Sequence, residues 1–167
     1  NKSGARFDPE KNNWYNQQWL QRKSDDELAQ MFNAELDAKG FSAEPEYIKR
    51  VVSAIKERAS FVKDFWDLSN YFFEAPSSYN EKAVKKQWKE GTPEIMNGVT
   101  NILENINDFE SSIITWISES ELSFGKVMPP LRLVIVGDMK GPHLFDIMAM
   151  IGKEESINRI KTAVARL

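Results

Sequence analysis

Hydrophobic side chains recur along this chain with the spacing of α-helices. Leu28, Met31, Phe32 and Leu36 follow one another at separations that place them on a single helical face. Stripes of the same kind run through residues 46–58, 61–72, 95–106, 109–122 and 154–167, and a shorter one through 141–152. A short polar helix is expected at 82–89. The pattern predicts an all-α fold, a helical domain built from roughly nine or ten short helices.

Residues with capping chemistry mark where these helices begin and end. Asp8 followed by Pro9 predicts a helix start, because proline fits the first helical position. Ser24 and Glu27 have the spacing of a capping box, which predicts the start of the next helix. Gly40 is expected to end that helix.

Two stretches decide how the helices are organised. Residues 74–78 are rich in turn formers, which predicts a boundary between two packed helical subdomains, 1–75 and 76–167. The β-branched run at 131–137 has the composition of a buried strand. No other segment alternates with the period of a strand, and a lone strand cannot pair its backbone groups. We therefore expect a buried helix at 131–137.

Composition narrows the class of protein. The chain has 167 residues and no cysteine, which excludes disulfides and thiolate zinc sites and fits a reducing compartment, here expected to be the cytoplasm. It has neither an apolar run that could span a membrane nor a signal peptide. Asn1 stands where an intact protein would have methionine, so we expect a fragment. The net charge of −3 disfavours nucleic acid, but residues 122–167 carry seven Lys and Arg against four Asp and Glu.

Catalytic motifs are missing from the sequence. There is one histidine, His143, and its place beside Pro142 predicts an exposed or capping residue rather than a general base. No phosphate-binding glycine loop and no metal-binding histidine motif occurs. We therefore predict no catalytic residue and no metal site in this chain.

Aromatic and basic residues interleave at two places, where RNA bases could stack and phosphates could pair with cations. The first combines Trp14, Tyr15 and Trp19 with Lys11, Arg22 and Lys23, and the second combines Trp88 with Lys82, Lys85, Lys86 and Lys89. Tryptophans at helical spacing are more often core residues, so this pattern alone assigns no function.

Three segments, taken in order, carry a family resemblance. The first is Lys2-Ser3-Gly4-Ala5-Arg6-Phe7-Asp8 with Lys11 and Trp14-Tyr15-Asn16; the second is Arg58 with Phe61-Val62-Lys63-Asp64-Phe65. The third is Pro130-Leu131-Arg132 with Gly137, Gly141-Pro142, Leu144-Phe145 and Gly152-Lys153-Glu154. Together they resemble the C-terminal half of bacterial glutamyl-tRNA synthetases, which is a helical stem-contact and anticodon-binding region, and the resemblance covers nearly the whole chain.

The resemblance implies a role for each matching residue. Arg58 matches the arginine that reads the third anticodon base, where its donors suit the acceptors of cytosine and oppose the donors of guanine. Arg132 matches an arginine beside the first anticodon base, Gly141 and Leu144 match positions that pack on that base, and Pro142 fits a rigid turn. Contacts with the tRNA stem are implied for Lys2, Arg6, Trp14 and Asn16.

Three positions depart from the family pattern. Threonine often stands at the position of Gly141, so only backbone contacts with the base are expected there. Pro129 stands where a polar residue is common, and Asn12 replaces a leucine.

The resemblance also implies what lies outside this chain. The two ATP-site signatures of the family, one beginning His-Ile-Gly and one built on Lys-Met-Ser-Lys, do not occur here. No cofactor is therefore expected in this fragment, whereas the parent glutamate–tRNA ligase would use ATP and Mg²⁺. The expected partners are glutamate tRNA and the N-terminal catalytic domain, in a monomer that binds no membrane. Two alternatives remain: a relaxed enzyme that also charges glutamine tRNA, and a helical protein–protein scaffold.

Overall fold

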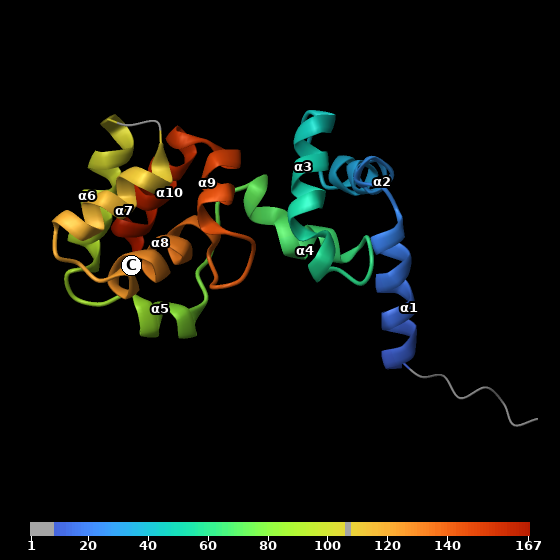
Figure 1. The fold of residues 1–167 in the computed structure, drawn as a ribbon, viewed down its shortest axis with the longest axis horizontal. Helices are drawn as coiled ribbons and strands as arrows, with labels where there is room; N and C mark the ends of the chain where they lie inside the picture. The colour runs from blue at the N-terminus through green and yellow to red at the C-terminus, as the bar shows by residue number, and fades with distance from the viewer. Residues whose placement is uncertain (1–8, 106–107) are drawn as a thin grey trace, which may run out of the picture. The chain divides into compact units, whose positions relative to one another are not determined.

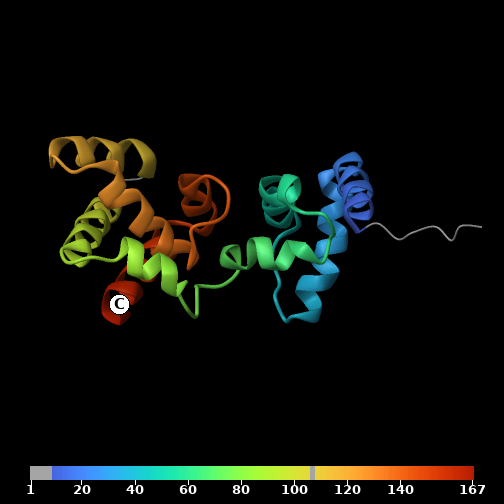
Figure 2. The same cartoon turned by 90° about the horizontal axis from the view of Figure 1, so that it is seen from below.

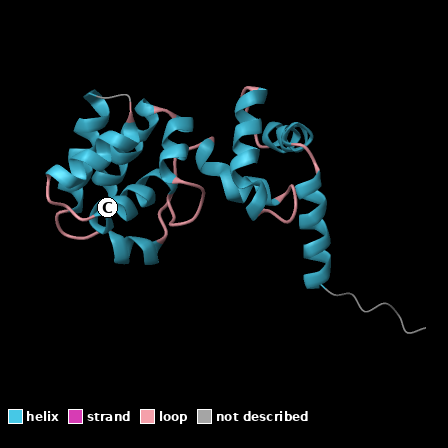
Figure 3. Cartoon of the chain, viewed as in Figure 1, coloured by secondary structure: helices cyan, strands magenta, loops and turns pink. Residues whose placement is uncertain are grey.

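The computed structural model of the chain describes residues 9–105 and 108–167 (Figure 1). These residues form ten α-helices and two short 3₁₀-helices, with no strand among them (Figure 3). The all-α prediction is therefore confirmed, including its helix count. No helix in the described ranges is both long and apolar enough to cross a membrane.

The chain divides into two compact units, Asn1–Asn70 and Tyr71–Leu167. The division lies before the turn-rich run at 74–78, within which the second subdomain was expected to begin, at residue 76. A short 3₁₀-helix, η2 (Asn70–Phe72), contains the boundary. The first unit contains α1 (Pro9–Arg22), α2 (Asp25–Ala38), α3 (Pro45–Ile55), η1 (Lys56–Arg58) and α4 (Asp64–Ser69).

The first unit is built on the packing of α2 against α3, with α4 closing over both (Figure 2). Phe32 of α2 and Phe65 of α4 meet edge to face with ring centroids 5.5 Å apart. Both rings are fully buried, so this pair anchors the core of the unit. Helix α1 attaches through side chains: the Gln21 amide donates to the Lys56 carbonyl at 3.2 Å.

The start of α2 is the capping box expected from Ser24 and Glu27. The Ser24 hydroxyl accepts the Glu27 backbone N–H at 3.2 Å, and the Glu27 carboxylate accepts the Ser24 backbone N–H at 2.9 Å. The Lys23 ammonium lies 3.1 Å from the same carboxylate. These contacts lower the pKa of Glu27 from 4.5 to about 2. The hydrogen bond from the Ser24 backbone N–H has the largest effect, and those from Lys23 and the Ser24 hydroxyl have smaller ones.

Acid is expected to remove the stabilisation that Glu27 gives to α2. Because the pKa of Glu27 is lower in the folded state, its contribution is complete above pH 4.5 and disappears as the pH falls to about 2. Thermal unfolding of wild type and Glu27→Gln should therefore differ at neutral pH and converge in acid. A melting-temperature difference that stays constant down to the acid limit would contradict this assignment.

The second unit is built around α8, a central helix that packs against α5, α6 and α10. Its helices are α5 (Glu81–Gln87), α6 (Thr92–Asn105), α7 (Phe109–Glu119), α8 (Phe124–Val136), α9 (Leu144–Ile151) and α10 (Lys153–Arg166). The ambiguous run at 131–137 forms the end of α8, so the prediction of a buried helix is confirmed. Leu131, Leu133 and Val134 there have no exposed surface.

Helix α8 continues through two consecutive prolines, Pro129 and Pro130. A proline cannot donate to the carbonyl four residues earlier, which leaves the carbonyls of Gly125 and Lys126 without those helical bonds. Both residues are exposed, so water can satisfy their carbonyls at little cost.

A buried arginine joins three parts of the second unit. Arg159 of α10 is only 2% exposed, and its Nη1 donates to the carbonyls of Tyr71 at 2.7 Å and Ile135 at 2.8 Å. Its Nε donates to Glu155 Oε1 at 2.7 Å, one turn earlier on α10. The guanidinium thus satisfies carbonyls at the end of α8 and in η2, which would otherwise be buried without donors.

Candidate nucleic-acid interface

The loop between α8 and α9 is a tight turn with a glycine of positive φ near each end. Helix α8 ends at Gly137, whose φ of 84° is left-handed and whose N–H donates to the Leu133 carbonyl at 2.8 Å. A Cβ at Gly137 would lie 2.8 Å from the Pro76 side chain, so the close approach of the segment between η2 and α5 also requires glycine here. At the far end, Gly141 has a φ of 119° and leads into Pro142. We call residues 137–142 the interhelix turn.

Arg132 holds the interhelix turn in place from the side of α8. Its Nη2 donates to the Pro142 carbonyl at 2.8 Å, and its Nη1 donates to the Lys140 carbonyl at 3.4 Å. The family resemblance assigned Arg132 and Gly141 to one base and Pro142 to a rigid turn, and these three residues come together in one site. In this structure the guanidinium directs two donors at the backbone of the turn, a role the sequence did not suggest.

Leu144 and His143 differ in their availability to a ligand. The Leu144 side chain is only 2% exposed, so it lies in the core rather than on the surface where a base would pack. His143 occupies the N-cap of α9 without a side-chain capping bond, and its side chain is 55% exposed. The expectation that His143 is an exposed residue is confirmed.

Arg58 ends η1 in the first unit and lies on the surface. Its Nη1 donates to the Ala54 carbonyl at 3.3 Å, and no carboxylate in the described residues lies within ion-pair distance of it. The chain beyond it is fixed, because Asp64 accepts the backbone N–H groups of Ser60 at 3.0 Å and Phe61 at 2.8 Å. Arg58 therefore presents a guanidinium from a well-held segment.

The aromatic residues of α1 are on the surface of the first unit rather than in its core. Trp14 and Tyr15 are each 55% exposed and contact one another edge to face, while the Lys23 ammonium lies 4.8 Å from the Trp19 ring centroid. The Asn16 amide donates to the Asn12 carbonyl at 2.8 Å. Lys2 and Arg6, the other predicted stem contacts, lie outside the described residues.

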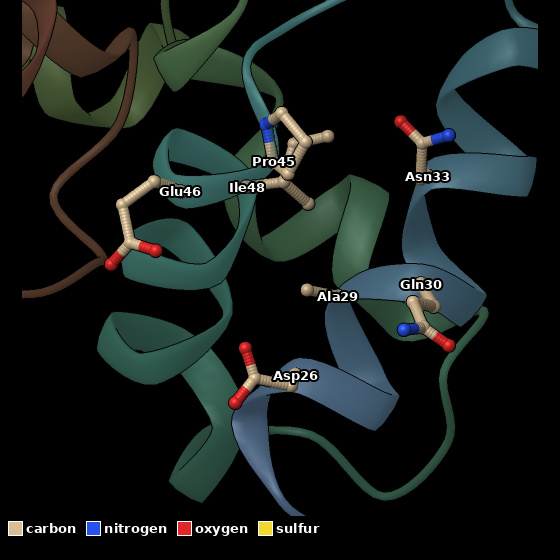
Figure 4. Close-up of a pocket in the computed structure, with 7 residues that line it drawn as sticks. All are labelled: Asp26, Ala29, Gln30, Asn33, Pro45, Glu46 and Ile48. Atoms are coloured by element: carbon tan, nitrogen blue, oxygen red, sulfur yellow. The ribbon is translucent and has the colours of Figure 1, made fainter.

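A pocket of about 290 Å³ opens between α2 and α3 (Figure 4). Its polar groups are already engaged in part, since Asp26 pairs with Lys49 at 2.9 Å and Asn33 donates to Asp37 at 3.1 Å. The residues lining it are Asp26, Ala29, Gln30, Asn33, Pro45, Glu46 and Ile48. None of the predicted site residues lines this pocket. Within the described part of the chain, no group of three His, Asp or Glu could hold a metal ion.

Comparison with known proteins identifies the same kind of region. The family described as "Anticodon binding domain" matches residues 27–164. The glutamate–tRNA ligases of Flavobacterium johnsoniae and Flavobacterium psychrophilum are 53% and 52% identical over 171 residues, covering 99% of this chain and 34% of their own length. The crystal structure of a glutamate tRNA ligase from Elizabethkingia meningosepticum in complex with its amino acid superposes with a TM-score of 0.92 at 40% identity.

That crystal structure is matched over 99% of this chain and 34% of its own. The chain therefore spans about a third of the length of the relatives it matches, and the similarity is to their C-terminal third. Because the family match extends from α2 to the last turns of α10, the chain belongs to the family of anticodon-binding domains.

Proposed function

We propose that this chain binds the tRNA for glutamate and reads its anticodon. The observation that carries the proposal is the Arg58 guanidinium, which is exposed and is supplied by a fixed segment of a chain belonging to the anticodon-binding family. Such a guanidinium offers donors to the O2 and N3 atoms of a cytosine. A guanine at the same position would face it with its own N–H groups, and an unmatched donor costs roughly 1–3 kcal/mol.

The interhelix turn supplies a second group of contacts in this proposal. Arg132 fixes the backbone at Lys140 and Pro142, so N–H and C=O groups of the turn are held ready for the edge of a splayed base. Gly141 leaves that backbone without a side chain. Leu144 is buried at the start of α9, just after the turn in the chain, and in this proposal it has a positioning role rather than a stacking one.

Replacing Arg58 with alanine is expected to abolish discrimination at the third anticodon base. Wild type should bind glutamate tRNA roughly tenfold or more tightly than the same tRNA with that cytosine changed to guanine, which corresponds to about 1–3 kcal/mol. Arg58→Ala should bind both RNAs alike. Filter binding at fixed low salt measures the four affinities.

The matched control is Arg50→Ala, because Arg50 is also an exposed arginine of the first unit and its loss changes the net charge equally. It should retain the preference for cytosine. Equal binding of both RNAs by wild type would remove base reading from the proposal and leave the relaxed enzyme, which also charges glutamine tRNA. No RNA binding at all would favour the scaffold alternative.

We further propose that the parent protein is a glutamate–tRNA ligase of the cytoplasm, active as a monomer. The described residues do not fit a Mg²⁺–ATP site, since they contain no cluster of carboxylates suited to the ion. Glutamate, ATP and Mg²⁺ are therefore assigned to the remaining two thirds of the enzyme, as the length of the relatives suggests. This chain would contribute binding energy that orients the tRNA acceptor end at a distant catalytic centre.

A further inference from the structure

Helix α5 presents a row of lysines on one side of the second unit. Lys82, Lys85 and Lys86 are spaced at i, i+3 and i+4, which places them on one helical face, and all three are exposed. The opposite side of α5 packs against α8 and buries Ala83. Lys89 continues the row just beyond the helix, where its ammonium donates to the Lys85 carbonyl.

The row is positive in a unit that is otherwise acidic. Residues 71–167 carry eleven Lys and Arg against thirteen Asp and Glu, yet no acidic residue lies between Lys82 and Lys89. Two other cations of the unit are paired with carboxylates: Lys161 with Glu104 at 2.8 Å and Arg159 with Glu155 at 2.7 Å. Within the described residues, no salt bridge reaches the lysines of α5.

Helix stability does not account for this arrangement. Cations are favourable near a helix C-terminus, which suits Lys85 and Lys86 in the last turn of α5. Lys82 lies in the first turn, where the helix dipole opposes a positive charge. Like charges at i, i+4 also destabilise a helix, as Lys82 and Lys86 do here. An anionic ligand would remove both penalties.

The lysine row is attached directly to the interhelix turn. Asn80, the N-cap of α5, donates its backbone N–H to the carbonyl of Gly137, the first residue of that turn, at 2.8 Å. Trp88, the C-cap of α5, is half-buried and lies between Lys86 and Lys89 in the sequence, and an aromatic ring at such a place can stack on a base. The turn proposed to contact a base and the cationic face thus belong to one hydrogen-bonded assembly.

We propose that the exposed face of α5, formed by Lys82, Lys85, Lys86 and Lys89, binds the phosphate backbone of the RNA whose anticodon contacts the interhelix turn. The proposal rests on the proposed function for the identity of the RNA. A second site joined to the first by a backbone hydrogen bond adds affinity without adding base specificity, because phosphates are the same at every position. The α5 face therefore sets affinity and salt dependence, while Arg58 sets the choice of base.

The test is the salt dependence of RNA binding by Lys82→Ala/Lys86→Ala. Glutamate tRNA is titrated with the full chain at several salt concentrations, and the slope of log affinity against log salt is compared. The double variant should bind roughly tenfold more weakly at low salt and should lose about 0.7 to 0.9 of slope for each phosphate contact removed. Its preference for cytosine over guanine at the third anticodon base should not change.

The control is Lys49→Ala/Lys161→Ala, which removes a half-buried and an exposed lysine, both held in salt bridges elsewhere, and changes the net charge by the same amount. It should keep the wild-type slope. Wild-type affinity and slope in the α5 double variant would overturn the inference while leaving anticodon reading intact. Polyglutamate, which stands in for an acidic protein segment, is titrated as a second ligand. If the double variant loses polyglutamate binding but binds RNA as wild type does, the α5 face binds an acidic protein segment and the inference is overturned. An absence of RNA binding by wild type would instead remove the proposed function itself.

Discussion

Arg159→Met is expected to lower the free energy of unfolding of the second unit by about 3–5 kcal/mol. Methionine keeps much of the apolar volume of the arginine side chain but supplies none of its donors. The carbonyls of Tyr71 and Ile135 would then remain buried without the hydrogen bonds of 2.7 and 2.8 Å that they now accept. Each buried acceptor left unsatisfied costs about 1–3 kcal/mol. The single substitution removes both hydrogen bonds, so both costs are incurred together.

Urea unfolding of wild type and variant measures this loss, with the midpoint and slope fitted separately. Lys161→Met is the control on the same helix, since Lys161 is an exposed residue paired with Glu104 and should cost no more than about 1 kcal/mol. Glu155→Gln separates the contribution of the carboxylate, because the amide oxygen can still accept from Arg159 Nε. A loss below about 1 kcal/mol for Arg159→Met would show that water replaces the guanidinium.

The sequence predicted most of the helices because each is marked by local chemistry. Ser24 and Glu27 form their capping box, Gly152 follows the end of α9, and the apolar stripes of α2 and α3 are buried as their period requires. The run at 131–137 was assigned correctly by an argument about backbone pairing rather than by propensity. The boundary between the units depends on contacts between distant residues, so turn composition at 74–78 could not fix it to the residue.

The parts of the site that depend on long-range contacts were not accessible from sequence. Glu155 and Arg159 have the spacing of an ordinary exposed ion pair on a helix, and only the fold shows that the arginine is buried against a carbonyl 88 residues away. The family resemblance placed Arg132 beside the first anticodon base, but it did not reveal the two hydrogen bonds from Arg132 to the backbone of the interhelix turn. The same holds for Leu144, whose burial depends on how α9 packs.

Gly141→Ala is expected to destabilise the second unit by roughly 2–4 kcal/mol and to weaken RNA binding through the interhelix turn. The φ of 119° at Gly141 is one that alanine rarely adopts, and holding it there costs about 1–3 kcal/mol. The new Cβ would also lie 3.0 Å from the Tyr71 hydroxyl and 3.6 Å from Arg132 Nη1. Relief of that contact displaces either the aromatic ring or the guanidinium, and the guanidinium holds the carbonyls of the turn.

Gly152→Ala separates backbone strain from crowding. Gly152 has a φ of 90° and no atom within 4 Å of the position of a new Cβ, so alanine there meets strain alone. If the destabilisation by Gly141→Ala exceeds that by Gly152→Ala, the difference measures the contact with Tyr71 and Arg132. Gly141→Ala should then also lose RNA affinity while keeping the preference that depends on Arg58. Equal destabilisation by the two variants, with RNA affinity unchanged, would mean that the turn adjusts freely and that Arg132 does not determine its shape.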